Sequence, residues 1–340
     1  MAFARGRGPT PLDDGEGERH SRLGAKGLLV VSFVAVMTSC AEEREDFRDC
    51  SAVDVSGAEA LPMQLSETGL YDDIAGGVLS DAALEFTPRF PLWTDGAKKR
   101  RWLVLPEGEQ VDTRDPEDWR FPIGTRTFKE FTRDGIRIET RMNVKTEAGW
   151  SAAAYIWNDT GDDAIRQMST AENVAGTPHD VPGAAECQAC HGGRRNFTLG
   201  FSATQLEPEL RAALFDAGVL SDPVEAELEL EPEAREALGV LHGNCSHCHN
   251  ADRNDQAQAT DCYTLERNFD LSLPAGLTAV EDAPALQTAS EQLGDATRSK
   301  VVDRMSRRDA DEDRPSMPPL GTELVDEQGV EAVRAFVETL

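Results

Sequence analysis

The chain has 340 residues, with 62 Asp and Glu against 34 Lys and Arg, and its formal net charge is -28 at pH 7. This acidity excludes nucleic acid as an expected partner, because phosphate binding needs a cationic surface. It also argues against electrostatic adsorption to anionic lipid headgroups. The length accommodates two domains of ordinary size, and the charge suits a well-solvated surface or the steering of a basic protein partner.

The N-terminus predicts export. An apolar run over residues 28–37, too short to span a bilayer, follows five basic residues, which are Arg5, Arg7, Arg19, Arg22 and Lys26. The run ends in Met37-Thr38-Ser39-Cys40, which resembles a bacterial lipobox, although Leu is usual where Met37 stands. We expect residues 1–39 to be a lipoprotein-type signal peptide and Cys40 to carry a lipid that anchors the protein at the periplasmic face of a bacterial membrane. An ordinary structural thiol at Cys40 is the alternative.

Residues 40–85 are acidic and weakly patterned, which predicts a tether with short irregular structure. Strand-like segments follow at residues 101–105, 127–132, 136–145 and 150–156. In the third segment the apolar face would consist of Ile136, Ile138, Thr140, Met142 and Val144. Asp134-Gly135 is a strong hairpin signal. We therefore predict an antiparallel β-meander, covered on one face, within a β-rich domain over residues 86–225.

The last hundred residues have helical periodicity instead. Pro232 suits the first position of a helix that carries Ala234, Leu238 and Leu241 at helical spacing. A second apolar stripe, at the end of the chain, consists of Val330, Val333, Phe336, Val337 and Leu340. A shorter helical stretch is predicted around residues 299–307. These features predict a small all-α domain over residues 226–340, so the expected fold class is α+β.

Two Cys-x-x-Cys-His motifs carry the chemistry, namely Cys187-Cys190-His191 and Cys245-Cys248-His249. Two thiols three positions apart can add across the two vinyl groups of one haem, and the adjacent His can donate an axial nitrogen to the iron. The sequence therefore predicts two covalently bound haem c groups, with His191 and His249 as iron ligands.

Other uses of these cysteines fit less well. A zinc site built from both pairs would need a shorter gap than the one between Cys190 and Cys245, and zinc gives no reason for a His after each pair. A thioredoxin-like redox pair needs a βαβ context that the sequence does not predict. A disulfide within each pair is geometrically awkward.

Met317 is the predicted sixth ligand of the second haem. It stands before Pro318 and Pro319, which hold the loop extended and so lower the cost of aiming the thioether at an iron. His/Met ligation raises the reduction potential and leaves no open coordination site, which favours electron transfer. Met305 is the rival ligand, and a gap-filling core methionine is the alternative for Met317.

The sixth ligand of the first haem is open. His179, in Pro178-His179-Asp180, is the leading candidate, and the others are His242, His247, Met142 and Met168. An unoccupied sixth position is an equal alternative, and it would make this haem a candidate catalytic centre.

Of the seven cysteines, one is assigned to lipid and four to haem, which leaves Cys50 and Cys262. Two leftover thiols tend to pair in an oxidising periplasm, so we expect a disulfide between them.

Several short motifs resemble those of a family of bacterial exported dihaem c-type cytochromes, over roughly residues 85–340. They are Leu92-Trp93-Thr94-Asp95-Gly96-Ala97, Phe121-Pro122-Ile123-Gly124-Thr125, Ile138-Glu139-Thr140-Arg141, Tyr155-Ile156-Trp157-Asn158, Val181-Pro182, Asn244 and Met317-Pro318-Pro319. The resemblance implies a β-rich domain ending in one haem motif, joined to a small domain similar to class I cytochrome c. It settles neither the sixth ligand of the first haem nor any substrate.

The leading functional hypothesis is an electron carrier between periplasmic redox partner proteins. The enzymatic alternative is a dihaem peroxidase or oxidase that uses an open first haem. The position of the β-rich region and the closeness of the two motifs argue against the familiar two-domain dihaem peroxidases. A third hypothesis is an anchored haem subunit whose β-rich domain docks a larger redox complex.

Overall fold

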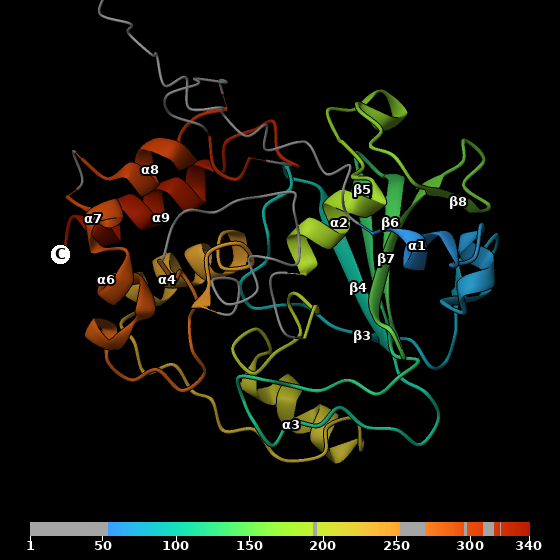
Figure 1. Ribbon diagram of the computed structural model, residues 1–340, viewed down its shortest axis with the longest axis horizontal. Helices are drawn as coiled ribbons and strands as arrows, with labels where there is room; N and C mark the ends of the chain where they lie inside the picture. The colour runs from blue at the N-terminus through green and yellow to red at the C-terminus, as the bar shows by residue number, and fades with distance from the viewer. Residues whose placement is uncertain (1–53, 193–195, 252–268, 296–297, 309–315, 320) are drawn as a thin grey trace, which may run out of the picture. The chain divides into compact units, whose positions relative to one another are not determined.

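A six-stranded antiparallel sheet occupies the first half of the described chain. The computed structural model describes residues 54–192, 196–251, 269–295, 298–308, 316–319 and 321–340. The strands follow one another in sequence order and are β3 (Leu84–Glu85), β4 (Lys98–Val104), β5 (Arg126–Arg133), β6 (Ile136–Thr146), β7 (Gly149–Trp157) and β8 (Ala164–Gln167). This order confirms the predicted antiparallel meander (Figure 1). The β5–β6 turn at Asp134-Gly135 has φ values of 50° and 83°, as the predicted two-residue hairpin requires.

One face of the sheet packs against the residues that precede it. Trp102 and Tyr155 are fully buried there together with Leu65 and Leu70. The covering elements are α1 (Ser56–Glu59), the 3-10 helix η1 (Leu65–Thr68), β1 (Tyr71–Asp73) and β2 (Val78–Leu79). The predicted tether over residues 40–85 therefore has a folded second part, because apolar side chains are interspersed among its acidic residues. Residues 40–53 lie outside the described residues.

The other face of the sheet is also covered, which corrects the expectation of a sheet covered on one face. Trp102, Leu103 and Val104 are consecutive in β4, and each is at most 1% exposed. Because successive side chains point to opposite faces, this is possible only when both faces are buried. Leu103 belongs to a cluster with Trp119 and Phe201 that extends to α3 (Pro208–Asp216).

A β-bulge changes the predicted apolar face of β6. The pairing of β5 with β6 shifts register between Phe131 and Thr132, so Ile138 is an extra residue on the bulged strand. Ile138 consequently packs with Ala154 and Val181 rather than with Met142. Ile136, predicted on the same face, is 51% exposed beside the turn.

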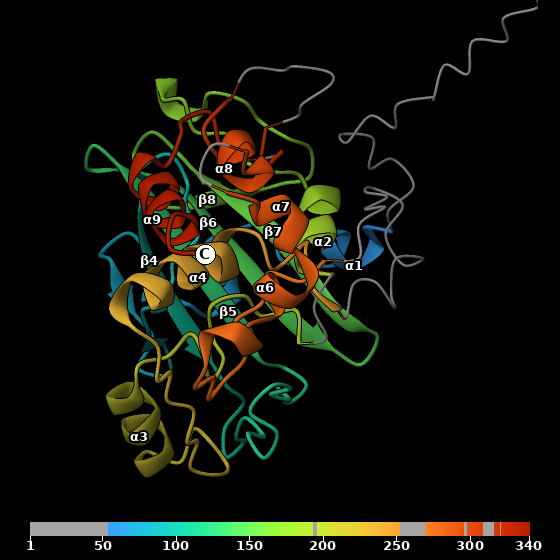
Figure 2. The same cartoon turned by 90° about the vertical axis from the view of Figure 1, so that its left-hand side faces the viewer.

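The C-terminal region is helical, as predicted. Its helices are α4 (Pro232–Asn244), α6 (Pro284–Thr288), α7 (Ser290–Leu293), α8 (Lys300–Met305) and α9 (Glu327–Val337). Pro232 occupies the first turn of α4, and α4 packs against α9 through Leu238, Leu241, Val333 and Phe336. Leu340, predicted on the apolar stripe, lies beyond the end of α9 and is 58% exposed. The described chain is therefore a mixed α+β fold (Figures 1 and 2).

Among the described residues, no helix combines the length and the apolar character needed to cross a membrane.

Residues 86–97, between β3 and β4, link the sheet to α4. Gly239 and Gly243 of α4 both face Phe90 in this segment. A Cβ atom at Gly243 would lie 2.5 Å from the carbonyl oxygen of Phe90, closer than any real Cβ contact. The two glycines therefore allow the segment to lie directly against the helix that leads into the second Cys-x-x-Cys-His motif.

Replacing Gly243 with Ala should separate this segment from α4. Overpacking costs about 1–3 kcal/mol, which outweighs the at most roughly 1 kcal/mol that Ala gains over Gly in a helix. We expect thermal unfolding to show a lower Tm for Gly243→Ala. Glu236→Ala, an exposed change in the same helix, is the control and should alter stability by about 0.5 kcal/mol or less. Equal stability of the two variants would contradict this packing.

Candidate haem-binding site

The first motif lies on the short helix α2 (Ala184–His191), which packs against β7. Cys187, Cys190 and His191 are spaced i, i+3 and i+4, so the helix presents them on one side. The helix begins at Gly183, where a Cβ would lie 2.8 Å from the carbonyl oxygen of Met168. The Gly183 N–H donates to Glu186 at 2.9 Å, which caps the first turn. Cys187 is buried against Ala152 of β7.

The ring of His191 is held in a defined tautomer. Its Nδ1 lies 2.8 Å from the carbonyl oxygen of Phe197, and because a carbonyl only accepts, Nδ1 must carry the proton. The lone pair of a neutral ring is then on Nε2, the arrangement of a metal-ligating His fixed by a backbone carbonyl. Burial lowers the pKa of His191 to about 4, so the ring is neutral at physiological pH.

The cysteines are poorly suited to the alternative chemistries. Burial raises the pKa of both Cys187 and Cys245 to about 12, so neither is a thiolate at neutral pH. Redox-active cysteines have lowered pKa values instead, which disfavours a thioredoxin-like role. Within the described ranges, no three His, Cys, Asp or Glu side chains are grouped to hold a metal ion.

The second motif is a turn at the end of α4. Cys245 caps the helix, and its carbonyl oxygen accepts the N–H groups of Cys248 at 3.0 Å and of His249 at 2.8 Å. The ring of His249 stacks on Phe269, with centroids 4.3 Å apart and planes inclined by 13°. The backbone carbonyl of His249 also accepts the N–H of Leu271 at 2.9 Å, so the chain at Leu271 lies beside the motif.

Residues of both motif regions line one cavity of about 780 Å³, a volume in the range of cofactor sites. Cys187, Cys190 and His191 line it from α2, and Ser246 and His247 line it from the second motif. Two buried hydroxyl oxygens on its wall, of Thr198 and Thr322, have no hydrogen-bond partner among the described residues. Such orphaned polar atoms fit a wall that contacts a bound group.

Met317 lies in the loop between α8 and α9 and is partly buried. Its backbone N–H donates to the carbonyl of Arg304 at 3.0 Å, and its neighbours Ser316, Pro318 and Pro319 line the cavity. The structure thus brings the predicted Met loop to the same cavity as the second motif. Ligation by Met317 remains a prediction. The rival Met305 is 7% exposed in the helical core.

The segment Leu92-Trp93-Thr94-Asp95-Gly96-Ala97 connects this loop region with the second motif. The Trp93 N–H donates to the side chain of Asn244 at 2.6 Å, and the Trp93 indole N–H donates to the carbonyl of Leu324 at 3.0 Å. The two carboxylate oxygens of Asp95 accept the N–H groups of Glu323 at 2.9 Å and Leu324 at 2.8 Å. Trp93 and Asp95 belong to a motif that the sequence shares with the resembling family, but their contacts could not be predicted from the sequence.

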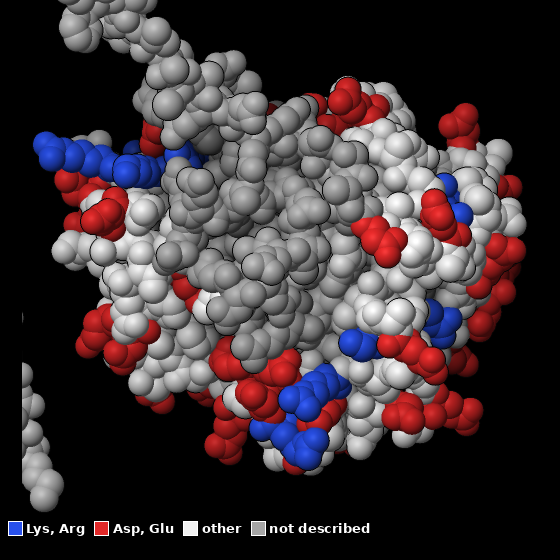
Figure 3. Space-filling model, in the orientation of Figure 1, with Lys and Arg blue, Asp and Glu red and all other residues white. Residues whose placement is uncertain are grey.

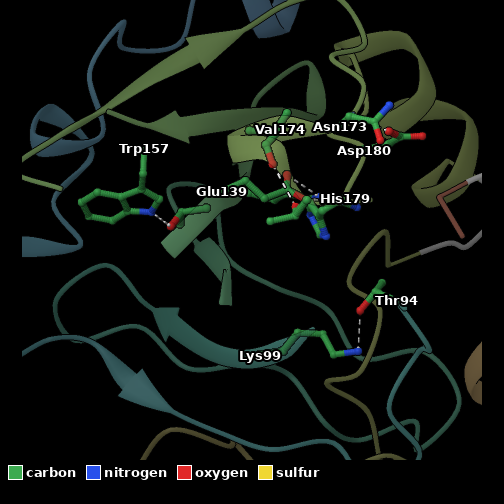
Figure 4. Close-up of polar contacts among 11 residues, drawn as sticks. Thr94, Lys99, Glu139, Trp157, Asn173, Val174, His179 and Asp180 are labelled. Atoms are coloured by element: carbon green, nitrogen blue, oxygen red, sulfur yellow. Dashed lines mark hydrogen bonds and ion pairs between the residues drawn. The ribbon is translucent and has the colours of Figure 1, made fainter. Parts of the chain in front are cut away.

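His179, the predicted sixth ligand of the first haem, is engaged in a buried charge cluster (Figure 4). Its Nε2 lies 2.8 Å from Glu139, which is fully buried and also binds the guanidinium of Arg141 at 2.9 Å. Burial alone raises the pKa of Glu139, but Arg141 and the hydrogen bonds from His179 and Arg141 outweigh it and lower the pKa. The carboxylate is therefore ionised and only accepts, so Nε2 of His179 carries a proton. Haem ligation by His179 remains a prediction, and it would have to use Nδ1.

The other candidate ligands are placed differently from one another. Met142 is buried on the sheet face that packs against η1, away from the cavity. His242 and His247 both line the cavity. Nδ1 of His242 accepts the N–H of Leu273 at 3.0 Å, so the proton of its neutral ring is on Nε2.

The sheet contributes a row of cations that sequence analysis did not find. Arg101, Lys129 and Arg141 line the cavity from β4, β5 and β6. Burial, then the charges of Arg101, Lys99 and Arg141, lower the pKa of Lys129 well below its ordinary value. Lys99 is close by, donates to the Thr94 hydroxyl at 2.7 Å (Figure 4), and has its pKa lowered to about 7, chiefly by burial. These internal cations contrast with the exterior, where Asp and Glu predominate in the described part of the visible face (Figure 3).

The predicted signal peptide over residues 1–39, the lipidation site Cys40 and the predicted disulfide between Cys50 and Cys262 lie outside the described residues.

A scan of protein-family models, a search of curated proteins and a search of solved structures each found no match for this chain.

Glu139→Gln should destabilise the protein strongly, because it leaves Arg141 and His179 buried without their carboxylate. Breaking a buried ion pair lowers the free energy of unfolding by about 3–5 kcal/mol. The folded-state pKa of Glu139 is lowered, so its stabilisation is present above the unfolded pKa of roughly 4.3 and disappears as pH falls through the lower folded value. Thermal unfolding from pH 7 to pH 3 should therefore show the Tm difference from wild type narrowing below about pH 4.

Glu85→Gln is the matched control, because Glu85 is a half-exposed carboxylate paired with Arg100. It should cost about 1 kcal/mol or less. A Tm difference for Glu139→Gln that does not depend on pH would refute the ionised state of Glu139.

Proposed function

We propose that this chain is an exported dihaem c-type cytochrome that carries electrons between periplasmic redox partner proteins. The observation that carries the proposal is the geometry of the first motif. Two cysteines and a His are on one side of α2, the His ring is fixed with its Nε2 lone pair available, and all three line a cavity of cofactor size. Neither a redox thiol pair nor a zinc site requires this combination of features.

Cys187 and Cys190 would attach the first haem and His191 would ligate its iron. Cys245, Cys248 and His249 would do the same for the second haem, with Met317 as the sixth ligand. When bound, each haem supplies an iron that accepts and returns one electron. The chain positions the thiols on α2 and at the end of α4 and keeps the His191 ring neutral by burial.

The C-terminal helices support a domain similar to class I cytochrome c. In that arrangement a helix leads into the haem motif, a Met-containing loop follows, and a terminal helix packs on the first helix. α4, the loop at Met317 and α9 occur in this order, and α4 packs against α9. The domain boundary near residue 225 is part of the proposal.

Export and lipid anchoring at Cys40 are proposed from the basic and apolar pattern of residues 1–39. The acidic exterior would suit a basic redox partner, because opposite charges accelerate association.

Covalent haem content tests the proposal directly. The chain, produced with a haem-attachment system and denatured, should retain two haems in intact mass and pyridine haemochrome spectra. Cys187→Ser with Cys190→Ser should retain one haem, and so should Cys245→Ser with Cys248→Ser. Met63→Ala, at an exposed position, should retain both. A wild-type chain that binds no haem covalently would refute the proposal.

Met317→Ala should open the second haem to carbon monoxide or cyanide, because an axial thioether is lost. The spectrum of the first haem should not change. Met305→Ala is the control for a core methionine. It should leave an unfilled cavity, reduce the free energy of unfolding by about 2–5 kcal/mol and so lower the Tm. It should not create a haem that binds carbon monoxide or cyanide. Ligand binding after Met305→Ala but not after Met317→Ala would exchange their roles.

A further inference from the structure

The wall of the cavity that contains α2 also contains three basic side chains that have no role in the proposed electron transfer. Arg101 of β4 lies opposite Lys129 of β5, and Lys129 lies opposite Arg141 of β6. All three line the cavity. Directly opposite residues on antiparallel strands are about 5 Å apart, so the row extends over roughly 10 Å.

Only one of the three cations has a carboxylate partner. The Arg141 side chain binds Glu139, whereas the side chains of Arg101 and Lys129 form no ion pair or hydrogen bond with the described residues. The Lys129 ammonium lies 5.0 Å from the centroid of the Phe131 ring. Arg101 is nevertheless only 6% exposed. Burying a cation without a counter-charge is costly, and three adjacent cations repel one another.

Two carboxylates that line the cavity accept hydrogen bonds from groups outside the row. Glu186 accepts the N–H of Gly183 at 2.9 Å and the hydroxyl of Thr170, and Asp180 accepts the N–H of Asn173 at 3.0 Å. Two positions along the same strands, Thr127 of β5 lies opposite Asn143 of β6. This pair is uncharged, and the Asn143 amide donates to the Thr127 hydroxyl at 3.3 Å. The row is thus a positive patch in which Arg141 is the member with an ion-paired side chain among the described residues, inside a strongly acidic protein.

We propose that Arg101 and Lys129, with Arg141 beside them, form a binding site for a carboxylate or a similar oxyanion inside the cavity. The planar guanidinium of Arg101 can hold two oxygens of such a group, and Lys129 adds a point charge. Two kinds of group carry this chemistry. Either the propionate groups of the first haem occupy the site, which rests on the proposed function, or a small free anion binds there.

Two variants and one control test the site in the purified full-length holoprotein. Arg101→Gln and Lys129→Gln each remove one charge from the row. Lys98→Gln, at an exposed position in β4, removes the same charge outside the cavity. Each protein is titrated with sodium citrate and with sodium phosphate against sodium chloride of equal ionic strength, with Tm as the readout. The reduction potentials of both haems are measured by spectroelectrochemical titration.

If haem propionates occupy the site, both row variants lower the potential of one haem, because loss of a nearby positive charge stabilises the ferric state. Lys98→Gln leaves that potential unchanged, and the added anions have no effect beyond that of chloride. If a free anion binds, citrate or phosphate raises the wild-type Tm saturably, and the row variants bind about tenfold more weakly or worse. Arg101→Lys, which retains the charge, should keep most of the wild-type behaviour in either case and controls for folding.

The proposal is overturned if neither anion stabilises the wild type beyond chloride and the row variants match Lys98→Gln in both potentials. Its failure is distinguishable from failure of the proposed function. A chain without covalent haem refutes the cytochrome assignment through its haem content, whereas the anion titration gives its result on the chain in either state.

Discussion

The packing of residues 86–97 against α4 is the constraint on which the remaining site depends. The segment connects β3 to β4. Its contacts with Asn244 and with Glu323 and Leu324 therefore join the sheet to the end of α4 and to the chain before α9. Gly239 and Gly243 permit this approach, because any side chain there would collide with Phe90. Residues of this segment, among them Phe90 and Trp93, also line the cavity between α2 and the second motif.

The interior of this cavity has the opposite charge to the exterior of the protein. The net charge of -28 is carried mainly by exposed Asp and Glu, while Arg101, Lys129 and Arg141 are gathered on one face of the sheet. The fully buried carboxylate of Glu139, beside this row, is stabilised by Arg141 and His179. If the proposed first haem is bound, an internal positive field beside α2 would favour anionic groups on it and would raise its reduction potential.

Local signals in the sequence predicted much of the fold. Asp134-Gly135 identified the central hairpin because both positions need positive φ, and Pro232 identified the start of α4 because proline fits a first helical turn. The coverage of both sheet faces was harder to predict, since it follows from apolar residues dispersed through an acidic N-terminal segment. The bulge at Ile138 has no local signal, because it arises from the pairing of β6 with β5.

The attachment residues of the candidate site could be proposed from spacing alone, since each motif is contiguous. The cation row could not, because its members are 28 and 12 residues apart and become neighbours only through strand register. The engagement of His179 by Glu139 likewise joins residues 40 positions apart. Met142 was one of the ligand candidates behind His179, because the sequence does not show the strand parity that turns Met142 away from the cavity.

The contacts of Asp95 with Glu323 and Leu324 have a consequence for the order in which the molecule assembles. These residues are more than 220 positions apart, whereas the strands of the meander pair with their immediate neighbours in sequence. Because a chain is synthesised from its N-terminus and local pairings form fastest, the meander can form while the last helix is still being made. The part of the cavity wall formed by residues 321–323 can be completed only after these residues have been made and have docked on Asp95.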